Sequence, residues 1–196
     1  MTKHDPRHQC MIYEGAPSHY LPALAATIRD KLADNHRCLY LNSQPMVAGM
    51  RSYLSACGVD VAACVRKGSL VLSSSHDHLL DGEFDGDRML GLLVDAVEQA
   101  SKDGYKGLWA TGDMSWQFGP RGDFRQLLDY EMKLEKYFRT EARLSGVCQY
   151  HADTLPSDVM KKAEILHQSV FISATLSRVN PSYLPPEKLE ELFKSA

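Results

Sequence analysis

The sequence predicts an α/β domain with three layers, a mostly parallel sheet covered by helices on both faces. Short apolar segments alternate with amphipathic helical segments along nearly the whole chain. The helical segments run to roughly 12–18 residues, which suits right-handed crossovers between parallel strands. The 196 residues fit one domain of ordinary size and show no internal repeat.

The alternation begins at residues 9–13, a short strand that ends in a turn at residues 14–17. Apolar residues at helical spacing then predict a helix through residues 21–32, and Pro22 is tolerated there because it falls in the first turn. A second strand at residues 38–41 is followed by a helix that ends at Gly58. The order of a strand followed by a helix has thus occurred twice.

The next unit contains a third strand at residues 70–72, after an irregular or helical piece through residues 61–65. The strand leads into a polar run at residues 73–78. A long helix then begins near Asp85, a predicted N-cap, and ends at Gly104.

Three further strands are predicted at residues 108–111, 147–150 and 170–172, separated by helices at residues 127–138 and 157–166. The first of these helices is amphipathic, and its predicted exposed face carries Lys133, Glu135, Lys136 and Arg139.

The composition changes after Ala174, so the sequence predicts a domain over residues 1–174 and a linker with a short terminal helix over residues 175–196. Pro186 is placed at the first position of that helix. The helix carries Leu189, Leu192 and Phe193, and we expect it to dock on its own domain rather than on a partner.

The end of the fourth strand is the first candidate binding region. Asp113, Ser115 and Trp116 follow Gly112, where an open parallel sheet places its ligand crevice. The alternative for each residue alone is structural, with Asp113 capping the next turn and Trp116 half-buried in the core.

Several function classes are disfavoured by what the sequence lacks. The dipeptide Gly-Lys of a phosphate-binding loop occurs nowhere, and G-x-G-x-x-G and G-x-S-x-G are absent, which argues against an ordinary ATPase, dinucleotide enzyme or hydrolase. The net charge of −3 and the lack of a basic stripe disfavour direct nucleic-acid binding. No leader or membrane-spanning run is seen and the five cysteines are scattered, so we expect a cytoplasmic chain with free thiols.

The sequence predicts no metal site and no cofactor. His76 and His78 would share one face of a strand, and His4 and His8 form a second loose pair, but no further ligands occur at standard spacing. Surface or loop histidines are therefore the favoured interpretation.

Four polar or thiol residues remain ambiguous. Cys148 and Tyr150 share a strand face and are expected in the core, although the Tyr150 hydroxyl could reach the crevice. Glu131 lies on the apolar side of its helix, where it either pairs with a buried polar group or lines the pocket. His167 follows a helix C-terminus, which favours histidine without any function.

Short segments along residues 8–172 resemble the MEDS domain, the methanogen/methylotroph sensory domain of the DcmR type. In order they are HQCMIY (8–13), RCLYL (37–41), GVDV (58–61), GSLVL (68–72), DGEFD (81–85), GYKGL (104–108), GDMSW (112–116), DYE (129–131), VCQY (147–150) and the region around His167. The chain departs from the family pattern at Trp109, usually Arg, at Asp113, usually Glu, and at Gln168, usually Pro.

The resemblance implies a RecA/KaiC-like domain that lacks the phosphate-binding loop and senses small, hydrocarbon-derived ligands. The resemblance also implies that such domains occur beside DNA-binding domains, histidine kinases or anti-sigma-type kinase modules. Since no output domain is seen in this chain, the signal is expected to pass to a separate partner.

Our preferred hypothesis is a non-catalytic sensory module that binds a small organic ligand at the carboxyl edge of the sheet and signals to a histidine kinase or transcription regulator, with a homodimer left open. The expected lining is Tyr13, Asp113, Trp116 and Tyr150, supported by Glu131, His8 and His167. The alternative is a residual nucleotide-binding enzyme that uses Asp113, and a third reading is a scaffold without a ligand.

Overall fold

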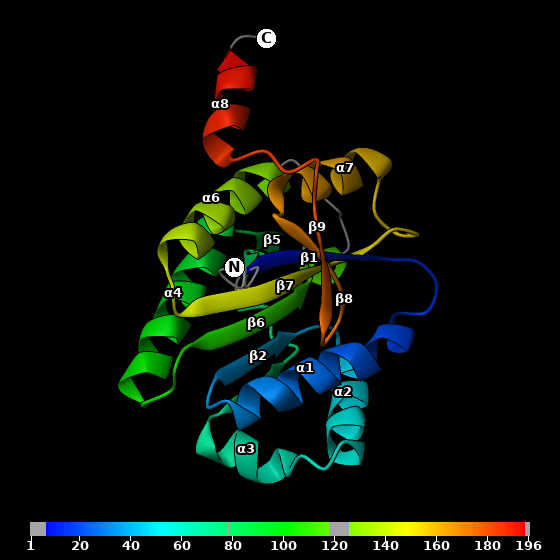
Figure 1. Cartoon of the computed structure of the whole chain (residues 1–196), viewed down its shortest axis with the longest axis vertical. Coiled ribbons are helices and arrows are strands. Elements are labelled where there is room, and N and C mark those ends of the chain that lie inside the picture. Colours follow the sequence, from blue (N-terminus) through cyan, green and yellow to red (C-terminus); the bar gives the residue numbers. More distant parts are fainter. Residues whose placement is uncertain (1–6, 78, 118–125, 195–196) are drawn as a thin grey trace.

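A computed structural model describes residues 7–77, 79–117 and 126–194. A seven-stranded sheet forms the centre of the molecule, with helices against both of its faces (Figure 1). Its strands are β1 (His8–Tyr13), β2 (Arg37–Leu41), β3 (Leu70–Ser73), β6 (Leu108–Asp113), β7 (Leu144–His151), β8 (Ser169–Ser173) and β9 (Leu176–Val179).

The helices connect these strands in the alternation that the sequence predicts. They are α1 (Leu21–Ala33), preceded by the 3-10 turn η1 (Pro17–Tyr20), α2 (Gln44–Ala56), α3 (Val61–Lys67), α4 (Gly86–Lys102), α5 (Met114–Gln117), α6 (Leu127–Thr140), α7 (Ser157–Leu166) and α8 (Pro186–Lys194). None of the helices within the described ranges has both the length and the hydropathy that crossing a bilayer requires.

The strand order is β3-β2-β6-β7-β1-β8-β9, and every neighbouring pair is parallel except β8 and β9. The predicted three-layer α/β fold is therefore confirmed, and the six predicted strands are the six parallel ones. Two features of the strands were not predicted. β9 lies in the segment expected to be a linker, and β4 (Leu79–Leu80) pairs with β5 (Glu83–Phe84) in a small separate hairpin.

Two hydrophobic cores lie on opposite faces of the sheet. The helices α1, α2 and α3 cover one face, where Ile28 and Met50 pack against Cys38 and Tyr40 of β2. The helices α4, α6 and α7 cover the other, with Leu93 among their buried residues. Successive strand residues point to alternate faces, so the parity of a position decides which core its side chain enters.

Local chemistry fixes the helix ends as the sequence predicts. The Asp85 carboxylate accepts a hydrogen bond of 2.9 Å from the backbone N–H of Arg88 and caps α4.

At Gly146 of β7 the close approach of the neighbouring strand β6 requires glycine, because a Cβ there would come within 2.2 Å of the Ala110 carbonyl oxygen.

Candidate functional site

The structure separates the predicted site residues onto opposite faces of the sheet. Tyr13 and Asp113 lie on the face covered by α1, α2 and α3. His8 and Tyr150 lie on the opposite face, together with Glu131 from α6 and His167, which follows α7. Trp116 belongs to α5, and its side chain lies outside the described part of the chain.

Strand register explains the separation. Directly paired residues of neighbouring strands point to the same face, and Tyr150 of β7 pairs with Ile12 of β1. The residue opposite Tyr13 is His151, whose ring stacks on the Tyr13 ring at 4.9 Å. Tyr150 therefore shares no surface with Tyr13, although both lie near the carboxyl ends of their strands.

The group at the carboxyl edge is a compact hydrogen-bonded unit. The Tyr13 hydroxyl donates to Asp113 Oδ2 at 2.9 Å, and the Ser115 hydroxyl donates to Asp113 Oδ1. Burial, followed by the charge of Asp113 and the hydrogen bond to it, raises the pKa of Tyr13. Both carboxylate oxygens of Asp113 are thus bound by hydroxyl groups of the same chain.

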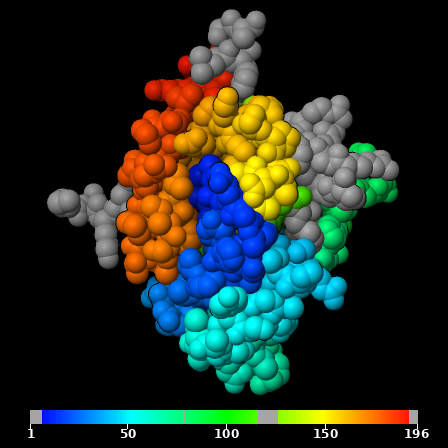
Figure 2. All heavy atoms as spheres, turned by 90° about the vertical axis from the view of Figure 1, so that its right-hand side faces the viewer, coloured from blue at the N-terminus to red at the C-terminus, as the bar shows by residue number. Residues whose placement is uncertain are grey.

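Figure 2 shows the surface at this edge. The turn after β1 (blue) lies against the turn after β7 (yellow). Two hydrogen bonds join them, from the Gly15 N–H to Asp153 Oδ2 at 2.7 Å and between His151 Nε2 and the Gly15 carbonyl oxygen at 2.8 Å.

The second group is larger and deeper. We call it the buried polar cluster, and it consists of His8, Glu131, Glu135, Cys148, Tyr150 and His167. None of its members is more than 6% exposed. Four different segments of the chain supply it, namely the start of β1, the middle of α6, the second half of β7 and the residue after α7.

Two carboxylates on one helix face dominate the cluster. Glu131 and Glu135 are four residues apart on α6, so both point toward the sheet from successive turns. The prediction that Glu135 lies on the exposed face is wrong, because its side chain is completely buried. The segment after β9 covers this part of α6, which periodicity within α6 alone does not reveal.

His8, Glu131 and His167 each have one polar atom engaged by a neighbour. The Tyr150 hydroxyl donates to Glu131 Oε1, and His8 Nδ1 lies 2.7 Å from Glu135 Oε2. His167 Nδ1 lies 2.6 Å from the carbonyl oxygen of Ala163. A carbonyl oxygen only accepts, so Nδ1 of His167 carries the hydrogen and Nε2 presents a lone pair when the ring is neutral.

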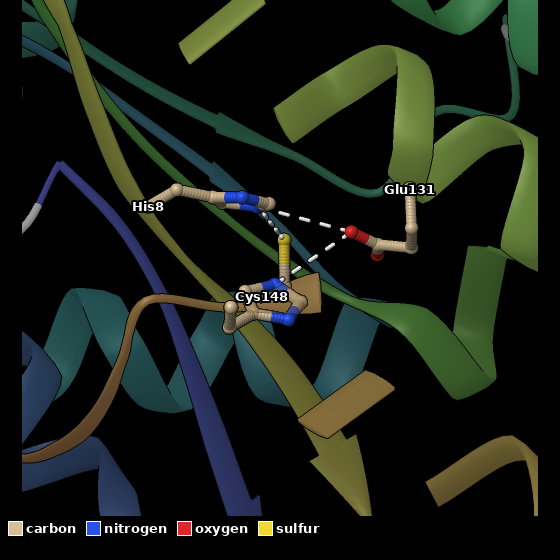
Figure 3. Close-up of side chains that lie close together, drawn as sticks. His8, Glu131 and Cys148 are labelled. Carbon is tan, nitrogen blue, oxygen red and sulfur yellow. Dashed lines mark hydrogen bonds and ion pairs between the residues drawn. The ribbon is translucent and has the colours of Figure 1, made fainter. Parts of the chain in front are cut away.

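The remaining polar atoms converge on one point. His8 Nε2 lies 3.5 Å from Cys148 Sγ and 3.8 Å from Glu131 Oε2, as Figure 3 shows for these three side chains. His167 Nε2 lies 3.6 Å from the same Glu131 oxygen. Among the described residues, neither Glu131 Oε2 nor His167 Nε2 has a hydrogen-bond partner.

Burial shifts the pKa values of several cluster members. Desolvation lowers the pKa of His167 well below its ordinary value and raises the pKa of the Cys148 thiol well above it. Desolvation also raises the pKa of Glu131, against the opposing effects of His8 and the Tyr150 hydrogen bond. The neutral ring of His167 is therefore suited to act as a lone-pair donor.

Glu135 links the cluster to the C-terminal segment. Its Oε1 accepts hydrogen bonds from the Tyr183 hydroxyl at 2.6 Å and from Gln168 Nε2 at 3.1 Å. Asn180 holds the same segment against α7 through the carbonyl oxygens of Glu164 and His167, at 2.6 and 2.8 Å. The end of the chain thus reaches the residue that orients His8.

A mostly apolar groove of about 480 Å³ lies between α4 and strands β2 and β3. We call it the α4 groove. Its centre is lined by Leu39, Leu41, Val71, Leu92 and Leu93, and polar residues occupy its two ends, Ser73, Ser75 and Asp77 at one and Arg37, Asp95 and Gln99 at the other. The end at Ser73 and Ser75 lies at the carboxyl end of β3, and so at the carboxyl edge of the sheet.

A second cavity borders both the α4 groove and the cluster. It measures about 40 Å³ and shares Leu39, Leu41, Met89 and Leu93 with the groove. Its inner wall includes Cys148 and Phe138, and the Phe138 ring stacks on the His8 ring at 4.3 Å.

Sequence reasoning missed the role of Glu135, the position of Cys148 beside two histidines and the α4 groove. The only local signal was the charged Glu131 on an apolar helix face. The histidine pairs considered from sequence each include a residue outside the described ranges, His4 in one and His78 in the other.

Comparison with known families places this geometry in context. A family model described as MEDS, the methanogen/methylotroph, DcmR sensory domain, matches residues 7–168. No curated protein gives a significant match. The matched range contains all the parallel strands except β8, which begins one residue after it, and it contains the whole buried polar cluster. The resemblance predicted from short motifs is thus confirmed, and the chain belongs to the MEDS family of sensory domains.

Proposed function

We propose that this chain is a non-catalytic sensory module that binds a small, mainly apolar organic molecule in the α4 groove. Ligand binding then changes the interaction of this chain with a separate signalling or transcription-regulatory protein. The observation that carries the proposal is the α4 groove itself, whose lining is mainly apolar and includes a few polar side chains.

The size and lining of the groove suit a small organic ligand. Its volume lies within the range of about 300–1,000 Å³ typical of small-molecule sites. Leu92 is 42% exposed at the surface, whereas Leu93 beside it is buried. Covering this apolar surface with an apolar ligand removes it from water, and Ser73, Ser75 or Arg37 can then orient a polar group at either end.

A contiguous set of contacts leads from the groove to the end of the chain. Met89 and Leu93 line both the groove and the small cavity, which reaches Phe138 against His8. His8 contacts Glu135, and Glu135 holds Tyr183. A ligand shifts such a chain only by favouring one of two arrangements, and dense packing limits the core to discrete arrangements.

The C-terminal helix is suited to being the moving part. Helix α8 lies against α6 at one end of the molecule (Figure 1). Ion pairs join Arg139 to Glu187 and Lys136 to Glu190, and all four side chains are at least 39% exposed. Exposed ion pairs contribute at most about 1 kcal/mol each and the buried Leu189 about 1.5–3 kcal/mol, so releasing α8 costs a few kcal/mol.

A thermal-shift screen with small apolar molecules such as toluene, cyclohexanol and 1-hexanol tests the groove. At 100 times its dissociation constant a ligand stabilises the folded state by about 2.7 kcal/mol. For a chain of this length, that corresponds to a rise in Tm of about 5–11 °C.

Matched variants locate the binding. Ala96 lines the groove at a half-buried position of α4, so Ala96→Phe is expected to fill it and abolish the Tm rise. Ala48 is exposed on α2 on the opposite face of the sheet, so Ala48→Phe is expected to preserve the rise. The proposal fails if no member of the panel stabilises the wild type, or if both variants respond equally.

A further inference from the structure

We propose that His8 Nε2, His167 Nε2, Cys148 Sγ and Glu131 Oε2 bind one Zn²⁺ ion in the buried polar cluster. The four atoms lie within 4.8 Å of one another, and each comes from a different element of the fold. This site is separate from the α4 groove and does not rest on the ligand proposed for it.

The distances are close to those of a tetrahedral zinc site. Zinc–nitrogen and zinc–oxygen bonds of about 2.0–2.2 Å and a zinc–sulfur bond of about 2.3 Å place tetrahedral ligands about 3.3–3.7 Å apart. The separations of 3.5 and 3.6 Å described above fall within this range, and the separation of 3.8 Å between His8 Nε2 and Glu131 Oε2 lies just above it. The rest, at no more than 4.8 Å, require only small side-chain movements to close around an ion.

Hydrogen bonds to the outer atoms of three ligands leave their inner atoms directed at the same point. Glu135 binds Nδ1 of His8, the Ala163 carbonyl binds Nδ1 of His167, and the Tyr150 hydroxyl binds Oε1 of Glu131. Metal-bound histidines are commonly oriented in this way, by a carboxylate or a backbone carbonyl on the second ring nitrogen. The cluster therefore has both the ligands and the groups that orient them.

The unpartnered atoms indicate that the cluster accommodates a cation. His167 and Glu131 are at most 1% exposed, yet their facing Nε2 and Oε2 atoms have no hydrogen-bond partner among the described residues. At 3.6 Å they are too far apart for a good hydrogen bond between them. Leaving such buried atoms without a partner destabilises the folded chain, and a bound cation would remove that destabilisation.

The charge of the four ligand side chains favours a divalent ion. A thiolate at Cys148 and a carboxylate at Glu131 carry two negative charges, which Zn²⁺ neutralises, and the two imidazoles add none. Binding releases the thiol proton of Cys148 to solvent. The mixture of nitrogen, sulfur and oxygen ligands suits zinc, whereas Mg²⁺ and Ca²⁺ prefer oxygen ligands alone.

The test begins with the purified full chain, expressed with added ZnCl₂ and washed with a weak chelator. Elemental analysis is expected to give one zinc per chain. Exchange of zinc for Co²⁺ is expected to give the visible bands of a tetrahedral cobalt site and a thiolate-to-cobalt charge-transfer band in the near ultraviolet.

A matched cysteine pair provides the control. Cys10 and Cys148 are both buried and sit opposite each other in the register of β1 and β7. Cys148→Ala is expected to weaken zinc binding by about 100-fold or more, since even the loss of a group behind a ligand costs about 10–100-fold. Cys10→Ala removes an equivalent thiol outside the site and is expected to keep one zinc per chain.

Glu131→Gln provides a second variant that preserves the shape of the side chain, and it is expected to weaken zinc binding while the chain stays folded by circular dichroism. Two results overturn the proposal. One is a wild-type chain with neither stoichiometric zinc nor the thiolate-to-cobalt band. The other is equal zinc content in the Cys148→Ala and Cys10→Ala variants.

Discussion

The hydrogen bond between Tyr183 and Glu135 gives a direct measure of how firmly the C-terminal segment is tied to the cluster. Tyr183→Phe removes only the hydroxyl that lies 2.6 Å from Glu135 Oε1. A hydrogen bond to a charged group contributes about 1.5–3 kcal/mol to the free energy of unfolding. Tyr183 is half-buried and water can partly replace its hydroxyl, so we expect a loss of about 1.5 kcal/mol.

Glu135→Gln should cost more, about 3 kcal/mol. The amide places an NH₂ group or a neutral oxygen where the carboxylate now accepts from His8 at 2.7 Å, and the site is fully buried. In this background Tyr183 can bond only to a neutral group, so Tyr183→Phe should then cost about 0.5–1 kcal/mol. The double-mutant cycle therefore predicts a coupling energy of about 0.5–1 kcal/mol.

Urea unfolding of the four proteins, followed by circular dichroism, provides the free energies. Tyr53→Phe is the control, because Tyr53 is 38% exposed on α2 and its substitution should change stability by less than about 0.5 kcal/mol. The reasoning is refuted if Tyr183→Phe costs no more than Tyr53→Phe, or if the two substitutions are additive.

Three further predictions concern other parts of the molecule. Gly146→Ala should prevent normal pairing of β6 with β7 and sharply lower the yield of folded protein, whereas Gly91→Ala, at an open position of α4, should stabilise the chain by about 0.5–1 kcal/mol in urea unfolding. Burial raises the pKa of Cys10 and of Cys38 to about 12. Iodoacetamide should therefore leave both thiols unmodified at pH 8 until the chain unfolds, as measured by mass spectrometry. Rapid labelling of either thiol in the folded chain would contradict its burial. Isothermal titration with ATP and Mg²⁺ should show no saturable binding, because the Asp113 carboxylate is already bound by two hydroxyls, and a binding curve that is lost in Asp113→Asn would support an enzyme instead.

The fold was predictable because its signals are local. Apolar runs, helical spacing and the Asp85 cap each lie within a few residues of the element that they define. β9 escaped prediction because its residues are largely exposed and it exists only as the antiparallel partner of β8. A strand whose pattern depends on one neighbour carries little signal of its own.

The site was predictable only in part, because its geometry depends on register and on long-range packing. Tyr150 was placed beside Tyr13, but the pairing of Tyr150 with Ile12 directs it to the other face. A shift of one residue in register reverses such an assignment, and nothing within a single strand reveals it. His8 and His167 lie at opposite ends of the matched range, and their ring centroids are 4.1 Å apart. No spacing of metal-ligand residues along the sequence predicts this contact.

Hydrogen exchange of the C-terminal segment tests most directly whether the domain senses a ligand. The measurement compares amide exchange in residues 180–194 with and without a saturating concentration of the tightest-binding molecule from the thermal-shift panel. We predict that exchange in α8 changes on binding and that Ala96→Phe abolishes the response to the added molecule. Identical exchange in residues 180–194, while the groove is demonstrably occupied, would contradict the account.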